Sequence, residues 1–300
     1  MDAVRTSAKT EQVLGKYAFS RALRPFSFPV ALVTCLIGIL LAAQQLPINL
    51  FEALLVLIGG VLLQAGVNLI NDHDDIRLLQ HQPGSQPLID AIRHNFRFGM
   101  LCFLLAAAVG FHFVIQQGAG FLLLCMLGLV GALGYTLSPV NYKSRGLGVV
   151  LVFWLMGVLM IAGSALAMGA SLTLPLVLQT VPVSLLVSLL LLSNELRDHE
   201  HDQRDGLHTL TVRIGYAASV RLYLALLACA YLVAVLLLAL GLLPGALWLL
   251  LSLPLVFKPV CLLQASAEQR GPLTPATARL LLVFGVLFCV ALADPWPLPF

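Results

Sequence analysis

Two short acidic segments carry most of the side chains that could do chemistry. Each combines asparagines with aspartates at helical spacing: Asn68, Asn71, Asp72 and Asp75 in the first, and Asn194, Asp198 and Asp202 in the second. Residues three or four apart share one face of a helix, so each segment is predicted to form a stripe of oxygen ligands. Carboxylates this close repel one another unless a cation lies between them. Oxygen-only ligands of this kind suit Mg²⁺ better than a softer metal.

Mg²⁺ in proteins typically takes one or two carboxylates and leaves its other positions to water and phosphate oxygens. Two facing stripes would therefore hold two Mg²⁺ ions across a diphosphate. The predicted metal ligands and catalytic residues are Asp72, Asp75, Asp198 and Asp202. Amide and basic side chains are expected to bind the diphosphate itself: Asn68, Asn71, Asn194, Arg197, Lys143, Arg145 and Arg204.

The chain that must position these residues is strongly apolar. Of its 300 residues, 60% are hydrophobic and 10% are charged, and the mean hydropathy is +0.96. Soluble domains have about 25% charged residues, so we expect an integral membrane protein of the all-α class. Hydropathy predicts a polytopic bundle of about nine transmembrane helices of roughly 20 residues each. They lie near residues 28–45, 50–70, 98–116, 119–138, 147–169, 173–193, 219–241, 245–263 and 278–294.

Basic residues set the predicted orientation. Lys and Arg gather in the N-terminal segment and in alternate loops, and both acidic segments fall in loops of that set. The positive-inside rule places these loops in the cytoplasm. We therefore expect a multi-pass protein of the inner (plasma) membrane whose site faces the cytoplasm. The net charge of +3 follows from this asymmetry and does not indicate nucleic-acid binding.

The predicted organisation is one transmembrane domain with short ends. Residues 1–27 form a cytoplasmic segment that could lie on the membrane as an amphipathic helix, residues 28–294 form the domain, and residues 295–300 form a tail. The acidic segments follow the second and sixth spans, four spans apart. Because two similar segments recur four spans apart, the sequence predicts two pseudo-repeated four-helix halves followed by a ninth helix.

Three other interpretations of the charged segments are less favoured. A charged loop beside a membrane is often only a solvated determinant of topology, but two asparagine-led stripes on one side of the membrane disfavour that reading. A zinc site built on His199, His201 and His208 is disfavoured because residues two apart do not share a helical face. Cation-coupled transporters also use paired acids, but such acids are expected near the midplane, whereas these lie at span ends.

The motifs resemble those of the UbiA-type intramembrane prenyltransferases, and most closely the branch that acts on 1,4-dihydroxy-2-naphthoate in menaquinone synthesis. The first segment corresponds to that branch's NLxNDxxD motif. The long second motif retains Asn194, Arg197, Asp198, Glu200, Asp202, Gly206, Thr209, Leu210, Val212, Arg213 and Gly215. An Arg24-Pro25-Phe26-Ser27 opening and the stretch Tyr142 to Gly148 are also similar to the family's.

Four positions depart from the family pattern. Leu79 stands where the broader family often has a third acid, and His73 stands where the naphthoate branch usually has Tyr. Val149 and Leu207 replace an acid and a Lys of that branch. Loss of the acid at position 149 bears on the acceptor more than on the reaction type.

The resemblance implies Mg²⁺-dependent transfer of a polyprenyl group from an allylic diphosphate to an aromatic acceptor, with 1,4-dihydroxy-2-naphthoate expected. Membrane lipid would surround the apolar tail of the substrate. The alternatives kept open are another aromatic acceptor similar to 4-hydroxybenzoate, a lipid acceptor, a transporter, and a non-catalytic relative of the enzyme. The sequence does not determine the prenyl chain length or the oligomeric state.

Overall fold

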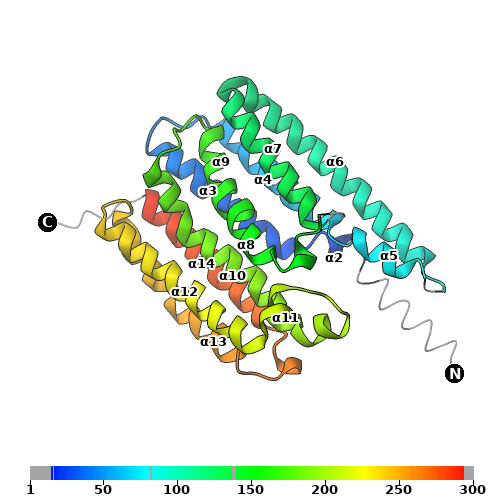
Figure 1. Ribbon diagram of the computed structural model, residues 1–300. Coiled ribbons are helices and arrows are strands. Elements are labelled where there is room, and N and C mark those ends of the chain that lie inside the picture. Colours follow the sequence, from blue (N-terminus) through cyan, green and yellow to red (C-terminus); the bar gives the residue numbers. More distant parts are fainter. Residues whose placement is uncertain (1–14, 16, 82, 137–139, 294–300) are drawn as a thin grey trace.

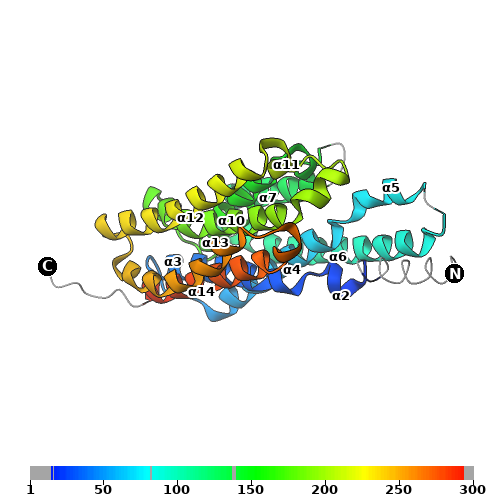
Figure 2. The ribbon, with the colours of Figure 1, turned by 90° about the horizontal axis from the view of Figure 1, so that it is seen from below.

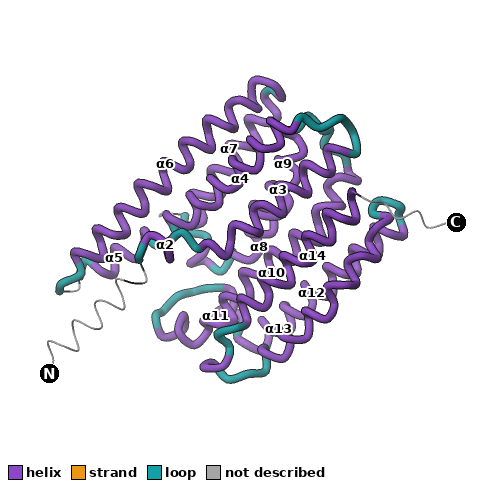
Figure 3. The backbone as a smooth tube through the Cα atoms, turned by 180° about the vertical axis from the view of Figure 1, so that it is seen from behind, coloured by secondary structure: helices purple, strands orange, loops and turns teal. Residues whose placement is uncertain are grey.

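The computed structural model describes residues 15, 17–81, 83–136 and 140–293. Helices joined by short turns make up this part of the chain, which contains no strand (Figure 3). The first half comprises α2 (Phe19–Ala22), η1 (Pro25–Ser27), α3 (Phe28–Ala43), α4 (Leu50–Ile70), η2 (His73–Asp75), α5 (Ile76–Leu79), α6 (Gln86–Gln117) and α7 (Ala119–Thr136). The second half comprises η3 (Lys143–Arg145), α8 (Gly148–Val152), η4 (Phe153–Leu159), α9 (Met160–Ala167), α10 (Leu174–Arg204), α11 (Leu210–Ile214), α12 (Tyr216–Ala239), η5 (Pro244–Val256), α13 (Phe257–Leu262), η6 (Ala267–Gln269) and α14 (Leu273–Ala293).

The predicted membrane spans are confirmed. Seven helical segments of the described residues are long and apolar enough to cross a membrane, and the shorter apolar helices α3 and α7 occupy the other two predicted spans. The fifth span consists of α8, η4 and α9 in succession, with π-helical winding in η4. The eighth consists of η5 and α13. Because η5 is a 3₁₀ helix, it rises about 2 Å per residue and crosses the bundle with few residues.

The helices pack side by side as a tilted bundle (Figures 1 and 2). Helix α3 packs against α4, α9 and α14, and α4 packs against α6. On the other side, α10 packs against α12, η4 and α14, while η5 packs against α14. The short helices α5 and α11 lie toward the same end of the bundle, where both acidic segments are found (Figure 1).

The described part of the N-terminal segment is not one continuous helix. Of residues 1–16, only Gly15 is described, so most of the predicted amphipathic helix lies outside the described residues. Downstream, the four-residue helix α2 and the 3₁₀ turn η1 lead directly into α3. Tyr17 is buried with Leu79, Leu88 and Ile92 in a small apolar cluster separate from the main core. Leu79 thus has a packing role at the position where the family often has an acid.

Close approach of α3 and α9 depends on Gly38. A Cβ atom built there would come within 2.6 Å of the Ser164 Cβ and would also clash with the backbone carbonyl of Ile161. Small residues allow membrane helices to approach in this way. We expect Gly38→Ala to destabilise the protein by about 1–3 kcal/mol, because overpacking forces a backbone shift. Unfolding in detergent would measure this, and Gly120→Ala is the matched control because its Cβ would meet open space. Equal stability of the two variants would contradict the prediction.

Candidate active site

The first acidic segment does not continue the helix that precedes it. The sequence predicted one helical stripe from Asn68 to Asp75, but α4 ends at Ile70 and the 3₁₀ turn η2 follows. Asn and Asp side chains compete for backbone hydrogen bonds and favour helix ends. Helix α4 therefore ends where the first acidic segment begins its run of Asn and Asp residues. The predicted single face is therefore wrong for this segment, and its acids point to different neighbours.

Each acid of the first segment has its own partner. Asp72 accepts a hydrogen bond from the Arg24 guanidinium at 3.1 Å and from the Asn71 amide at 3.2 Å. Asp75 accepts from the Tyr17 hydroxyl at 2.9 Å. The Asp72 side chain is 13% exposed, so its ion pair with Arg24 is shielded from much of the solvent. The N-terminal segment thus forms one wall of this part of the site.

Buried Asn68 fixes the position of the N-terminal segment around Arg24. Its amide donates to the Leu23 carbonyl and to the Ser27 hydroxyl, both at 2.8 Å, and its oxygen accepts from Gln64 at 3.1 Å. These bonds fix both ends of the turn that presents Arg24. The sequence predicted that Asn68 contacts the diphosphate; the structure places its side chain against residues 23–27 instead.

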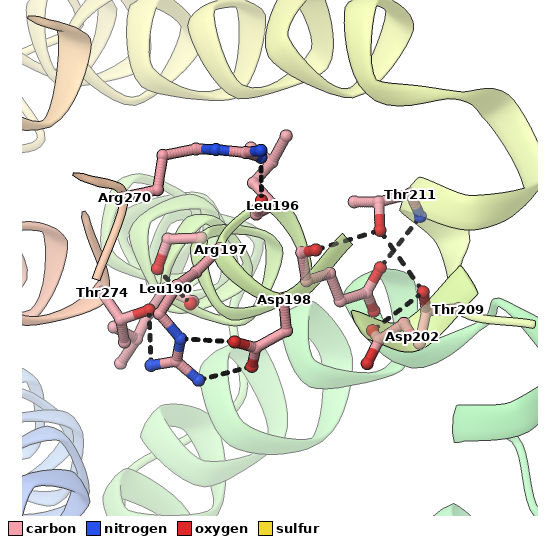
Figure 4. A network of polar contacts seen from close by, with 11 residues as sticks. Leu190, Leu196, Arg197, Asp198, Asp202, Thr209, Thr211, Arg270 and Thr274 are labelled. Atoms are coloured by element: carbon pink, nitrogen blue, oxygen red, sulfur yellow. Dashed lines mark hydrogen bonds and ion pairs between the residues drawn. The ribbon is translucent and has the colours of Figure 1, made fainter. Parts of the chain in front are cut away.

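The second acidic segment lies on the uninterrupted helix α10, as Figure 4 shows. The Arg197 guanidinium donates two hydrogen bonds to Asp198, at 2.7 and 2.5 Å, and a third to Thr274 at 3.2 Å. Asp202, one helical turn further on, accepts from the Thr209 hydroxyl at 3.4 Å. Asn194 lies one turn before Asp198 and is partly buried.

Arg270 supports the helical turn that carries Arg197 and Asp198. It donates to the Leu196 carbonyl at 2.7 Å (Figure 4). It also forms an ion pair with Glu200 and lies 4.4 Å above the Tyr216 ring. Its side chain is 4% exposed, whereas that of Glu200 is 43% exposed. The two ends of the turn from Leu196 to Glu200 are therefore tied to the segment between α13 and α14.

Glu200→Ala is expected to destabilise the protein by about 3 kcal/mol, because it leaves a buried guanidinium without its carboxylate. The double variant Glu200→Ala with Arg270→Met should recover most of that loss, since no unpaired charge is then buried. Unfolding in detergent measures both, with the exposed residue Glu268 changed to Ala as the control. A double variant less stable than the single one would contradict this explanation.

The loop between α7 and α8 adjoins both acidic segments. Asn141 donates to Asp74 at 2.7 Å. Farther along the loop, a Cβ built on Gly146 would come within 2.6 Å of Arg213, which follows the second acidic segment. Asn141 has φ 37° and Gly146 has φ 74°, so two left-handed residues give the loop its shape. One loop therefore links the surroundings of both segments.

The remaining predicted basic residues are dispersed. The Lys143 side chain lies outside the described part of the structure, and Arg145 is exposed in the same loop. Arg204, also exposed, donates to the Glu200 carbonyl on its own helix at 3.0 Å.

Val149 and Leu207, two of the positions that depart from the family pattern, differ in burial. Val149 is buried and Leu207 is exposed.

The donor set fits Mg²⁺ in its chemistry. Asp72, Asp75, Asp198 and Asp202 are partly accessible carboxylates, and both segments offer oxygen donors. Among the described residues, no three His, Cys, Asp or Glu side chains are gathered closely enough to hold a metal ion. Mg²⁺ does not require such a cluster, because water and substrate phosphates complete its shell. The residues are thus suited to a metal that arrives together with a phosphate ligand.

An apolar cavity begins beside this polar end. Its volume is about 360 Å³, and α4, α6, α7, η4 and α9 line it. Val67 and Tyr135 line the part near the acidic segments, and Phe113 and Phe121 line the part near the opposite turn between α6 and α7. This lining suits part of an apolar chain whose polar head lies at the acidic end.

Several residues of this region were not predicted as site residues. Arg24 and Arg270 are the clearest, followed by Asn141 and the buried Glu195, which accepts from the Thr211 backbone N–H at 3.1 Å. A Cβ on Gly148 would lie 3.5 Å from the Tyr135 hydroxyl and 3.6 Å from Glu195. In the sequence, Arg24 is part of the Arg-Pro opening, a motif that does not indicate the partner of its side chain. Arg270 is a charged residue beside an apolar span, and its spacing gives no sign of its contacts.

A bundle of apolar helices around an apolar cavity, with carboxylates at one end, is the architecture of an intramembrane protein that binds apolar molecules. The sequence pattern of the UbiA prenyltransferase family matches residues 31–272, and the chain belongs to that family. It is an integral membrane prenyltransferase.

Curated relatives cover most of the chain. A 1,4-dihydroxy-2-naphthoate octaprenyltransferase of Escherichia coli is 30% identical over 232 residues, covering 73% of this chain and 75% of the relative. The Bacillus subtilis protein of the same name is 26% identical over 281 residues, covering 90% of each chain. The human UbiA prenyltransferase domain-containing protein 1 is 29% identical over 288 residues, covering 93% and 84%.

Solved structures share the fold. A UbiA homolog from Aeropyrum pernix in its apo form has a TM-score of 0.66 at 19% identity, covering 91% of this chain and 98% of the other. A UbiA homolog from Archaeoglobus fulgidus bound to GPP and Mg²⁺ has a TM-score of 0.60 at 15% identity, covering 91% and 99%. At these identities the likeness establishes the fold alone.

Proposed function

We propose that this protein transfers a polyprenyl group from an allylic diphosphate to 1,4-dihydroxy-2-naphthoate in quinone biosynthesis, with Mg²⁺ as its cofactor. The observation that carries the proposal is the apolar cavity of about 360 Å³ that begins at Tyr135 and Val67, beside the two acidic segments. A polyprenyl diphosphate has the same division into an anionic head and a long apolar tail. The names of the bacterial relatives support the choice of acceptor.

The polar end would bind the diphosphate. Asp72, Asp75, Asp198 and Asp202 would hold Mg²⁺, which when bound neutralises the diphosphate as its bond to the allylic carbon breaks. Arg197 has a planar guanidinium suited to two phosphate oxygens at once. The turn that carries it is held by Arg270 and Thr274, so its position is set before substrate binds.

The apolar end would bind the tail and exclude water. Apolar side chains such as Phe103, Met156 and Leu159 make up most of the cavity lining, and the hydroxyl groups in it belong to Tyr135 and Ser164. Excluding water protects a reactive intermediate from hydrolysis. The acceptor ring would then supply the electrons of the new C–C bond and lose its carboxylate as CO₂, while diphosphate leaves as the other product. We place the active site on the cytoplasmic side of the inner membrane, because the basic loops lie at the same end of the bundle.

The test uses purified protein in nanodiscs with octaprenyl diphosphate, 1,4-dihydroxy-2-naphthoate and Mg²⁺, followed by mass spectrometry of the product. We expect a decarboxylated, prenylated naphthoquinol that disappears with EDTA and returns with added Mg²⁺. Reactions with 4-hydroxybenzoate test the alternative acceptor. Product with 4-hydroxybenzoate alone would overturn the acceptor, and no product with either, although diphosphate binds, would overturn the proposed transfer.

A further inference from the structure

The leading aspartate of each acidic segment is paired with an arginine. Asp72 bonds to Arg24 at 3.1 Å, and Asp198 bonds to Arg197 through two bonds of 2.7 and 2.5 Å. Two of the four carboxylates that the proposed function assigns to Mg²⁺ are therefore already neutralised by guanidinium groups. A bidentate guanidinium and a divalent cation compete for the same carboxylate oxygens.

The protein holds Arg24 at Asp72 by an uncommon backbone conformation. Arg24 has φ 50° and ψ 63°, in the left-handed region that residues other than Gly, Asn and Asp seldom adopt. Conformations of this kind persist only where the surroundings impose them, and they gather at functional sites. Here buried Asn68 imposes it by bonding to Leu23 and Ser27 on both sides of Arg24.

Arg197 is held by a separate set of contacts. Thr274 accepts one of its hydrogen bonds, and Arg270 fixes the preceding carbonyl, that of Leu196. The two arginines come from distant parts of the chain, yet each covers the first aspartate of its segment. The same arrangement therefore arises in both halves from unrelated supporting contacts.

We propose that Arg24 and Arg197 are exchangeable counter-ions of Asp72 and Asp198. Without substrate, they neutralise the two carboxylates. When Mg²⁺ and the diphosphate arrive together, the two carboxylates would bind the metal and the two guanidinium groups would bind diphosphate oxygens, for which their planar geometry is suited. Arg24 is thereby a diphosphate-binding residue. This inference rests on the proposed function, whose metal and diphosphate it uses.

The exchange couples the two ligands. Metal alone must displace an arginine that then has no anion to bind, so its affinity is low. Diphosphate supplies that anion and raises the affinity for metal, and by linkage the metal raises the affinity for diphosphate equally. Removing an arginine should therefore have opposite effects on the two ligands.

The experiment measures binding to the full chain in detergent, with Mn²⁺ as the metal probe and inorganic pyrophosphate as the anion. For Arg24→Met and Arg197→Met, we expect Mn²⁺ alone to bind about tenfold more tightly than to the wild type, as paramagnetic resonance of free Mn²⁺ reports. Pyrophosphate at saturating Mg²⁺ should bind about tenfold more weakly by calorimetry. Arg93→Met is the matched control, because Arg93 pairs with Asp90 at 3.7 Å and both side chains are exposed.

A merely structural role for the arginines predicts weaker binding of both ligands. That result, or unchanged Mn²⁺ affinity in both variants, would overturn the exchange. The proposed function is judged separately by prenylated product from the wild type. If the wild type gives prenylated product but the variants bind Mn²⁺ more weakly, the exchange is overturned and the proposed function stands. If the variants bind Mn²⁺ more tightly but the wild type gives no prenylated product, the proposed function is overturned and the exchange stands.

Discussion

Replacing Asp72 or Asp198 by Asn is expected to lower prenyl transfer by about a hundred- to a thousandfold each, the usual effect of removing one electrostatic contact to a transition state. Asn keeps the size of the side chain and can still accept a hydrogen bond from Arg24 or Arg197. It loses the charge that we propose to hold Mg²⁺. Initial rates of product formation at saturating Mg²⁺ measure the effect.

The control for these two variants is Asp90→Asn. Asp90 is an exposed acid on α6 that pairs with Arg93, and its loss should leave the rate unchanged. Thermal unfolding of all three variants separates lost chemistry from lost folding. A well-folded Asp198→Asn variant with more than about a tenth of the wild-type rate would exclude Asp198 as a ligand of the catalytic metal.

Gly128→Phe is expected to shift the preferred prenyl chain from long to short. Gly128 lines the cavity, and it lies seven residues before Tyr135 on α7, a distance of about 10 Å along the helix. A Cβ there would make only an ordinary contact with Leu159 at 3.6 Å, so a larger side chain can enter the cavity. Each five-carbon unit denied burial removes about 4 kcal/mol of binding free energy. We therefore expect kcat/KM for octaprenyl diphosphate to fall by up to about a thousandfold.

Dimethylallyl diphosphate should be used equally well by Gly128→Phe and the wild type, because its five carbons end before Gly128. Gly120→Phe is the matched control on the same helix, since a Cβ at that position meets open space outside the cavity. Competition between the two substrates in one reaction gives the ratio directly. An unchanged ratio in Gly128→Phe would show that the tail lies elsewhere.

The membrane-spanning helices of the described residues could be predicted from the sequence because the composition of each segment alone decides whether it can cross. About 20 apolar residues are needed to cross the hydrocarbon layer, and no distant contact alters that requirement. The stripe of Asn194, Asp198 and Asp202 likewise lies on the single helix α10. The prediction failed at α4, where polar side chains end the helix at Ile70 and the spacing rule for helices no longer applies.

The supporting residues could not be predicted because their partners are far apart in sequence. Asn68 acts on a turn 45 residues earlier, and Arg270 acts on a helix 70 residues earlier. The spacing of residues in either segment carries no sign of these contacts. Spacing indicated which residues carry charge and oxygen, whereas the tertiary structure determines which of them are already paired.

The loop between α7 and α8, which bonds to Asp74 through Asn141 and approaches Arg213 at Gly146, is also the covalent junction of the two halves. Dividing the gene there would create two new chain ends inside the site. Two co-expressed fragments could insert and associate, yet they would lack a continuous backbone between the surroundings of the two acidic segments. Fragments divided at Gly118, at the far end of the bundle, would keep that backbone intact and are the better choice for split-protein reconstitution.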